Sequence, residues 1–318
     1  MKFDNEQAKY LARFIAKNMI AREDVKASQL PRGQGAYVRD DSKWKMRDLI
    51  DHVTGKETYG HYLLDQDSNV KIIAFDIDLN QTGTYIPFAP EDHERYADDP
   101  TFMDDEQFIE FNPREAWVDR KHPARPWLKH QMRELVERFT DGCSHVGLGT
   151  FATYSGSKGV HVYGLYKDHV PPSYEPKTRI PAVEARILAF EAADWAMQNL
   201  TSMCYEYENM YELVPSKGKS FYRIVGTRRS TGDPVPLYRS FDNFSIEVFP
   251  KQDYIEPNRL GNLMRLPFGK NLKNPKDPTF VIDQCAASSS LVPVTDFEEL
   301  KVRLEGGNPW RSIANATA

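Results

Sequence analysis

Two acidic residues, Asp76 and Asp78, come directly after the apolar run Ile72-Ile73-Ala74-Phe75. Residues i and i+2 of a β-strand point to the same face of the sheet, so both carboxylates would project together. Like charges so close repel each other unless a cation lies between them, and oxygen ligands favour Mg²⁺ or Mn²⁺. The pair therefore predicts a divalent metal site. A solvated strand end that leads into a turn is the alternative interpretation.

A second segment with chemical potential is Ser155-Gly156-Ser157-Lys158-Gly159-Val160-His161. Glycines allow successive backbone N–H groups to converge on an anion, and Lys158 would add a positive charge for the same anion. After the turn, strand alternation directs His161 toward whatever the loop holds if Val160 is buried. The segment predicts a five-residue hairpin connection whose backbone forms a phosphate cradle. The alternative is an ordinary hairpin with a surface histidine.

Two further segments each place a single charged residue, Glu247 or Arg265, within an apolar run. In Ile246-Glu247-Val248-Phe249-Pro250-Lys251-Gln252, the carboxylate of Glu247 must lie on an exposed face or pair with a cation. In Gly261-Asn262-Leu263-Met264-Arg265, a turn signal precedes an arginine whose planar guanidinium suits phosphate. Glu247 could equally lie on an exposed strand face and Arg265 could be a surface arginine beside a loop, so neither segment is decisive alone.

The spacing of apolar residues predicts the elements that must position these side chains. We predict helices over 5–20, from Pro126 to Asp141-Gly142, from Pro181 with Val183, Ile187, Phe190 and Met197 on one face, and from a capping box at Thr295-Asp296-Phe297-Glu298 to Gly306. We predict strands over 59–64, 70–77, 146–154, 160–166, 221–226 and 244–249. Interspersed helices and strands indicate an α+β or mixed α/β fold.

The composition is that of a globular protein. Of the 318 residues, 40% are hydrophobic and 27% are charged, which is enough to build a sizeable core. No apolar run approaches the roughly 20 residues of a membrane helix, and the N-terminus has no signal-like apolar stretch. The three cysteines are too far apart for a zinc site and too few for a disulfide framework. We expect a cytoplasmic protein with no membrane partner.

The net charge of −5 is concentrated in one region. Between Glu91 and Asp119 there are eleven acids and two arginines, a balance of −9 that leaves +4 on the rest of the chain. The stretch 216–230 contains no acid, and its basic residues interleave with Phe221 and Tyr222. That pattern predicts contacts with a single-stranded template, although a solvated basic loop fits as well. The five basic residues are Lys217, Lys219, Arg223, Arg228 and Arg229.

Taken together, the four segments resemble the archaeo-eukaryotic primase superfamily, and most of all its bacterial and phage primase-polymerases, including CRISPR-associated and mobile-element relatives. The similarity covers roughly residues 59–270 in motif order. It implies an RRM-like antiparallel palm with flanking helices, and template-directed nucleotidyl transfer that uses two divalent ions. It further implies a protein of the bacterial cytoplasm, encoded by the bacterium or by a phage or plasmid.

The resemblance also assigns roles to residues of this chain. Asp76, Asp78 and Glu247 would be the catalytic carboxylates and would bind two Mg²⁺ or Mn²⁺ ions. The partners would be a single-stranded or primed DNA template and an incoming NTP or dNTP. Unwinding would need a separate helicase, because the chain has no GxxxxGK[ST] motif. The residues expected to hold the nucleotide are Ser155, Gly156, Lys158, Gly159, His161 and Arg265.

We expect one primase-polymerase catalytic unit over 1–318. It would comprise an N-terminal helical element (1–58), a catalytic core (59–290) with an acidic insertion (80–124), and a C-terminal helix and tail (291–318). The chain departs from the family pattern where many relatives carry Asp in place of Glu247, and it lacks a cysteine-rich zinc element. Two other functions stay open: another metal-dependent phosphoryl-transfer enzyme such as a nuclease, and a catalytically silent nucleotide- or nucleic-acid-binding protein on the same fold.

Overall fold

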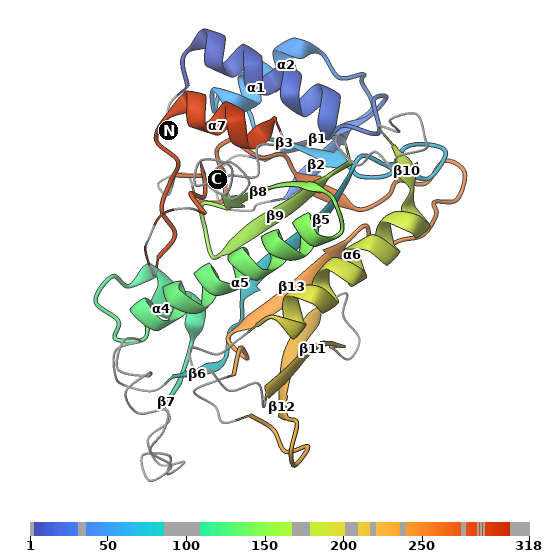
Figure 1. The fold of residues 1–318 in the computed structure, drawn as a ribbon. Coiled ribbons are helices and arrows are strands. Elements are labelled where there is room, and N and C mark those ends of the chain that lie inside the picture. Colours follow the sequence, from blue (N-terminus) through green and yellow to red (C-terminus); the bar gives the residue numbers. More distant parts are fainter. Residues whose placement is uncertain are drawn as a thin grey trace, which may run out of the picture.

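The computed structural model describes residues 3–30, 36–85, 109–166, 179–200, 209–216, 221–235, 240–274, 278–284, 286, 288 and 290–305. The fold is mixed α+β with antiparallel sheets, as the alternation of helical and strand patterns predicts (Figure 1). The helices in these ranges are α1 (Asn5–Asn18), α2 (Met46–Val53), α4 (Pro113–Val118), α5 (Arg125–His145), α6 (Ala182–Gln198) and α7 (Phe297–Leu304).

A seven-stranded sheet forms the centre, and its strand order is β11-β12-β13-β5-β9-β8-β15. Every neighbouring pair is antiparallel. All six strands expected from the sequence are present, although several bounds differ. The strands of this sheet are β5 (Ile72–Leu79), β8 (Gly149–Tyr154), β9 (Gly159–Leu165), β11 (Asn209–Pro215), β12 (Tyr222–Arg228), β13 (Phe244–Phe249) and β15 (Phe280–Val281).

Helices α5 and α6 cover one face of the central sheet (Figure 1). On β5, the fully buried side chains of Phe75 and Ile77 point toward this helical layer, and the Phe75 ring lies 4.6 Å from that of Phe139 on α5. On β12, the Tyr222 ring packs edge-on against Phe190 of α6. Because successive strand residues alternate between faces, this packing turns the acidic residues of β5 toward the opposite face.

A smaller four-stranded sheet has the order β14-β3-β1-β2. The predicted N-terminal helical element is therefore wrong in part, since residues 1–58 contribute two strands to this sheet as well as α1 and α2. The polar sequence Lys-Ala-Ser-Gln at 26–29 has no apolar alternation that would mark a strand. Two-stranded pairs are formed by β4 (Asn69–Val70) with β10 (Ile180–Pro181) and by β6 (Gly83–Tyr85) with β7 (Ile109–Phe111). The strands of the smaller sheet are β1 (Lys26–Gln29), β2 (Tyr37–Asp40), β3 (Tyr59–Tyr62) and β14 (Leu263–Arg265).

Helix α5 does not end at Asp141-Gly142, as the sequence predicts, but continues to His145. Gly142 serves packing and not termination: a Cβ atom built there would lie 2.2 Å from the backbone oxygen of Ala192 on α6. The two helices therefore touch backbone to backbone, and a glycine inside a helix is the only residue that permits this approach.

The predicted apolar face of α6 is right for Met197, which is buried, and for Phe190, which packs partly buried against the core, and wrong for its other two residues. Val183 and Ile187 are 48% and 56% exposed, so they do not face the core. The buried face consists of alanines and one methionine, because small side chains are what let α5 and α6 lie close together. These residues are Ala182, Ala185, Ala189, Ala192, Ala193, Ala196 and Met197.

The outer parts of the acidic segment 80–124 belong to the fold. Trp117 of α4 is buried, and its indole N–H donates to the Tyr154 hydroxyl at 3.0 Å. Arg114 donates through Nε to the backbone oxygen of Leu79 at 2.8 Å, which ties α4 to the end of β5. The predicted acidic insertion thus packs against the rest of the fold at both of its ends, while residues 86–108 lie outside the described ranges. The C-terminal helix is present as α7, but its N-cap is Asp296 and not Thr295.

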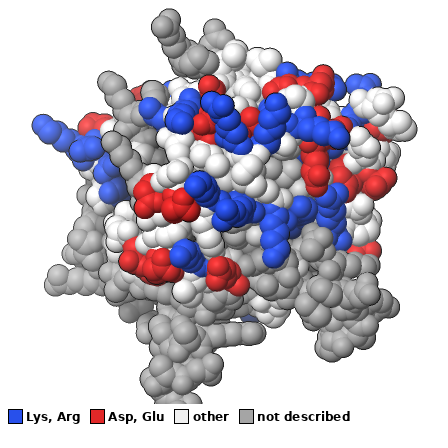
Figure 2. Space-filling view, turned by 90° about the horizontal axis from the view of Figure 1, so that it is seen from above, with Lys and Arg blue, Asp and Glu red and all other residues white. Residues whose placement is uncertain are grey.

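Basic and acidic side chains share the surface. Figure 2 looks down on the end of the molecule that carries α1, α2 and α7, and shows bands of Lys and Arg with groups of Asp and Glu between them. Among the described residues, no helix is both long and apolar enough to cross a membrane.

The contact between α5 and α6 generates a stability test. Gly142→Ala adds a methyl group where the nearest backbone oxygen is 2.2 Å away, so we expect the free energy of unfolding to fall by roughly 1–3 kcal/mol. Helix propensity alone would give the opposite sign, a gain of about 1 kcal/mol. Urea denaturation measures the difference, and Glu191→Ala on the exposed side of α6 is the control. A Gly142→Ala protein more stable than the native one would contradict the packing argument.

Candidate active site

Most of the residues expected to bind metal or nucleotide lie in one cleft of about 240 Å³. The central sheet contributes one wall through β5, β9 and β13, and the smaller sheet contributes the other through β1, β2 and β14. Residues more than 180 positions apart in the chain therefore meet at one place. The predicted site residues that line the cleft are Asp76, Asp78, Ser155, Lys158, His161, Glu247 and Arg265.

Strand register brings the three carboxylates together. Asp76 on β5 is the cross-strand partner of Glu247 on β13 and, on its other side, of His161 on β9. Directly paired residues share a face of the sheet, and Asp78 shares it because it lies two residues after Asp76. Strand β5 extends to Leu79, so both aspartates lie within the strand and not at a loose end beyond it.

Asp76 has unfavourable surroundings for a charge. Removal of its carboxyl group from bulk water raises its pKa well above the usual value, and the neighbouring charges of Asp78 and Glu247 raise the pKa further. Its Oδ1 atom is buried and has no hydrogen-bond partner. The Nε2 atom of His161 lies 3.5 Å from Oδ1. A bound cation would stabilise this buried carboxylate oxygen, which has no hydrogen-bond partner.

The other two carboxylates are each engaged by a lysine. Lys158 Nζ lies 2.6 Å from Asp78 Oδ2, and Lys251 Nζ lies 2.7 Å from Glu247 Oε2. Within the described ranges, no three His, Cys, Asp or Glu side chains are already gathered so as to hold a metal ion. The donor set still fits a hard divalent cation, because it consists of carboxylate oxygens around one buried, unpartnered oxygen. Entry of such a cation would require the two ammonium groups to move.

The Gly/Ser segment forms the predicted hairpin connection between β8 and β9. Gly156 adopts a φ of +70°, a conformation that other residues rarely take. At Gly159, a Cβ atom would lie 2.3 Å from Asp78 Oδ1, so only glycine lets the loop lie against that carboxylate. Arg265 Nη2 and Asn271 Nδ2 donate to the backbone oxygen of Ser155 at 2.7 and 3.0 Å and hold the loop in the cleft.

His161 is neutral in this site. Burial lowers the pKa of its imidazole to about 3, and the charge of Arg265 acts in the same direction. Its Nδ1 atom lies 3.0 Å from the hydroxyl of Tyr163, which stands two residues along the same face of β9. The ring is thus held in place and directs Nε2 into the cleft beside Asp76.

The predicted template-binding residues do not share one face. Tyr222 pairs with Ile246, which is fully buried on the side opposite Glu247. Strand alternation then puts Arg223 on the carboxylate side of the sheet and Arg228 on the helical side. Arg223, Arg228 and Arg229 are exposed, and Arg229 lies in the turn after β12. Lys217 and Lys219 lie outside the described residues.

Sequence reasoning missed several residues in or beside the site. The sequence assigns no role to Lys251, and the proline between it and Glu247 conceals that the two side chains are in contact. Tyr163 could have been predicted, because it lies two residues after His161 on the same strand and therefore shares its face of the sheet. Gln29, Tyr37 and Asn271 come from the smaller sheet and the loop after it, where no pattern in the sequence pointed to the cleft.

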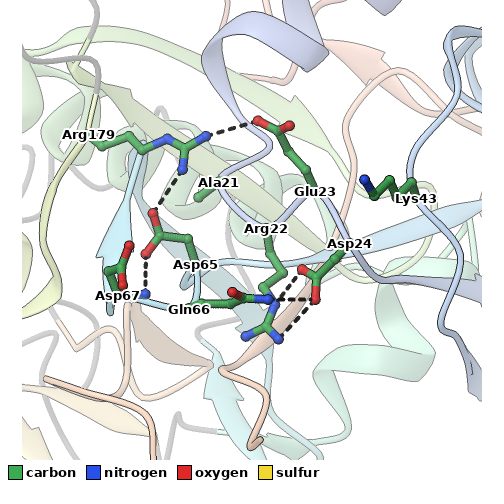
Figure 3. A pocket seen from close by; sticks show the side chains of 9 residues that line it. All are labelled: Ala21, Arg22, Glu23, Asp24, Lys43, Asp65, Gln66, Asp67 and Arg179. Atoms are coloured by element: carbon green, nitrogen blue, oxygen red, sulfur yellow. Dashed lines mark hydrogen bonds and ion pairs between the residues drawn. The ribbon is translucent and has the colours of Figure 1, made fainter. Parts of the chain in front are cut away.

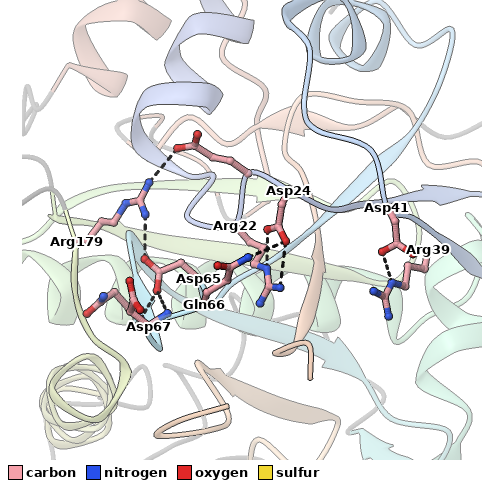
Figure 4. A network of polar contacts seen from close by, with 10 residues as sticks. Arg22, Asp24, Arg39, Asp41, Asp65, Gln66, Asp67 and Arg179 are labelled. Atoms are coloured by element: carbon pink, nitrogen blue, oxygen red, sulfur yellow. Dashed lines mark hydrogen bonds and ion pairs between the residues drawn. The ribbon is translucent and has the colours of Figure 1, made fainter. Parts of the chain in front are cut away.

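A second hollow, of about 440 Å³, lies beside the loop that follows α1 (Figure 3). Its charged side chains mostly engage one another: Arg179 bonds to Glu23 and Asp65 at 3.0 and 2.9 Å, and Arg22 bonds to Asp24 at 2.7 Å (Figure 4). None of the residues singled out in the sequence lines it. These ion pairs join the loop after α1 to the turn before β4 and to the segment before β10, so we interpret the hollow as structural.

The electrostatics of Asp76 generate a second prediction. A carboxyl group whose pKa is raised in the folded state destabilises the fold when ionised, so neutral pH is unfavourable for Asp76 in the metal-free protein. Asp76→Asn keeps the shape and removes the charge, and we expect the melting temperature in EDTA at pH 7 to rise by a few degrees. Asp67→Asn, at an exposed position, is the control and should change nothing. A lower melting temperature for Asp76→Asn alone would show that the Asp76 charge is not destabilising.

No protein-family model matches the chain, and no curated protein matches it either.

Proposed function

We propose that this protein is a template-dependent nucleotidyltransferase, a DNA primase-polymerase that joins nucleoside triphosphates on a DNA template with two divalent metal ions. The observation that supports it best is the convergence of three carboxylates and a Lys-bearing Gly/Ser loop in one cleft. A phosphoryl-transfer site needs both features: negative oxygens to hold cations and positive groups to hold a triphosphate. The antiparallel sheet covered by helices on one face is compatible with the expected RRM-like palm.

The metal ligands in this proposal are Asp76, Asp78 and Glu247. When bound, two Mg²⁺ or Mn²⁺ ions would activate a hydroxyl nucleophile and neutralise charge on the leaving pyrophosphate. The sheet supplies the rigidity, because all three ligands project from hydrogen-bonded neighbouring strands. The unpartnered oxygen of Asp76 and the repulsion that surrounds it favour occupancy by cations.

The chain's own cationic and polar groups would hold the incoming nucleotide. Lys158 on the hairpin loop and Arg265 on β14 lie on either side of the cleft and would contact the triphosphate oxygens, with His161 as a neutral hydrogen-bonding group between them. These residues position the α-phosphorus for attack by a primer 3′-OH, and pyrophosphate leaves. No protein nucleophile is required.

The proposal is tested with a labelled-nucleotide assay on a single-stranded DNA template, with and without an annealed primer, in Mg²⁺ and in Mn²⁺. We expect primer extension. Unprimed synthesis is the more demanding reaction, because an initiating nucleotide must be ordered without duplex contacts. Asp76→Asn, Asp78→Asn and Glu247→Gln should each reduce incorporation to background while the far-UV circular dichroism spectrum stays native. Asp67→Asn is the control that should keep full activity.

Three results would contradict the assignment. An active Asp78→Asn enzyme would exclude the proposed metal ligands. Strand cleavage without incorporation would favour the nuclease alternative, which uses carboxylates and no triphosphate cradle. Binding of nucleotide without incorporation, with either metal and either template, would favour the silent binding protein.

The parity of β12 yields a prediction for the template strand. If single-stranded DNA runs along the carboxylate side of the sheet, Arg223 can reach its phosphates and Arg228 cannot. Each lost phosphate contact reduces the magnitude of the slope of log affinity against log salt by about 0.7 on single strands. We expect that change for Arg223→Ala and an unchanged slope for Arg228→Ala, measured by fluorescence anisotropy with a labelled oligonucleotide. A change in slope for Arg228→Ala alone would put the template on the helical side.

A further inference from the structure

Lys251 makes several specific contacts but has no role in the proposed reaction. Its ammonium group lies 2.7 Å from Glu247 Oε2, and both side chains are mostly buried, at 22% and 19% exposure. The same ammonium lies 4.8 Å from the ring centre of Phe249 and 5.9 Å from that of Phe221. The ammonium group of this lysine is therefore held by a partly buried ion pair and by two cation–π contacts, which together stabilise it more than an exposed ion pair would.

The backbone of Lys251 is fixed independently of its side chain. Its N–H donates to Asn262 Oδ1 at 2.9 Å, and its carbonyl oxygen accepts a hydrogen bond from Arg186 Nη1. Arg186 is in turn held by Asp253 at 2.8 Å. The side chain can therefore change rotamer while the main chain stays in place, and the rings of Phe249 and Phe221 offer the ammonium a second favourable contact when it leaves the carboxylate.

Each of the three carboxylates in the cleft has a cationic group near it without a metal ion. Asp78 has Lys158, Glu247 has Lys251, and Arg265 lowers the cost of ionising Asp76. A divalent cation bound to the carboxylates would lie next to both lysines and would be repelled by them. Once displaced from Asp78, Lys158 can bind the triphosphate, because it belongs to the Gly/Ser loop that is proposed to hold the nucleotide. Lys251 does not line the cleft, and none of the contacts found among the described residues gives it a comparable role in holding the nucleotide.

We propose that Lys251 is an internal counter-ion: it holds Glu247 in the metal-free protein and is displaced from Glu247 when a divalent cation binds. This inference rests on the proposed function, because the metal site is part of it. Lys251 is a positioning residue that acts through Glu247 and touches neither metal nor nucleotide. It keeps the ligand ordered before the metal arrives, and it weakens metal binding because its own bond to Glu247 must first break.

The sign of this effect separates it from a merely structural role. If Lys251 only supported the fold around Glu247, its removal would weaken metal binding. If it competes with the metal for Glu247, its removal strengthens binding. A charge-assisted hydrogen bond has a net worth that corresponds to about tenfold or more in a binding constant.

The test measures Mn²⁺ binding alone, without nucleotide or DNA, by isothermal titration calorimetry and by the electron paramagnetic resonance signal of free Mn²⁺. We expect Lys251→Met to bind Mn²⁺ about tenfold more tightly than the native protein, and Lys251→Arg to bind it with native affinity. The matched control is Lys26→Met, because Lys26 has the same kind of partners: Asp48 at 2.5 Å and the rings of Trp44 and Tyr59 at 5.8 and 5.6 Å. Its affinity for Mn²⁺ should be native.

Three further controls guard against misfolding and coincidence. Lys251→Gln keeps a polar side chain of similar length and serves if the Met variant does not fold. In the Glu247→Gln background, Lys251→Met should give no gain in affinity, because the lysine acts through that carboxylate. The rise in melting temperature on adding Mn²⁺ should be larger for Lys251→Met than for the native protein, since tighter binding to the folded state stabilises it more.

The outcomes distinguish this inference from the function on which it rests. Equal or weaker Mn²⁺ binding by Lys251→Met and Lys251→Gln, with normal binding by the native protein, overturns the counter-ion role and leaves the proposed function intact. A gain that persists in the Glu247→Gln background also overturns it. A native protein that binds no Mn²⁺ removes the metal site, and the proposed function and this inference fall together.

Discussion

Electrostatic repulsion among three carboxylates in one cleft is the constraint that the rest of the structure accommodates. Asp76, Asp78 and Glu247 project from two paired strands, and their mutual repulsion together with burial raises the pKa of the Asp76 carboxyl. Side chains this close would move apart if the backbone were free to do so. The chain prevents it by placing them on hydrogen-bonded neighbouring strands and by setting a lysine against each of two carboxylates.

The rigidity that resists this repulsion comes from the other face of the sheet. Phe75 and Ile77 alternate with the aspartates along β5 and are fully buried under the helical layer, so a rotation of the strand that relieved the carboxylates would expose them. Helix α5 can press on the sheet together with α6 because Gly142 and the alanine face of α6 let the two helices touch. Apolar packing on one side thus stabilises an unfavourable charge arrangement on the other.

The part of this arrangement that follows from local periodicity could be predicted. Alternation along one strand was enough to put Asp76 and Asp78 on one face, and turn chemistry was enough to put a hairpin at residues 155–159. The register that brings Glu247 opposite Asp76 could not be read from spacing, because it depends on how distant strands pair. The apolar face of α6 was misjudged because alanine carries little hydrophobic signal, although close helix contact requires it. Lys251 was missed because its contact with Glu247 depends on the path of the chain around Pro250, which residue spacing does not reveal.

The two lysines differ in a way that bears on how such a site would work. Lys158 extends from a loop whose position depends on Arg265, Asn271 and the close approach of Gly159 to Asp78, so its release from that carboxylate puts a positive charge where a triphosphate would lie. Lys251 extends from a backbone fixed by Asn262 and Arg186, and release leaves its ammonium among aromatic rings. In the proposed enzyme, one displaced charge therefore becomes part of the nucleotide site and the other does not. By linkage, a cation that frees Lys158 must favour nucleotide binding, and a nucleotide that captures Lys158 must favour the cation to the same extent.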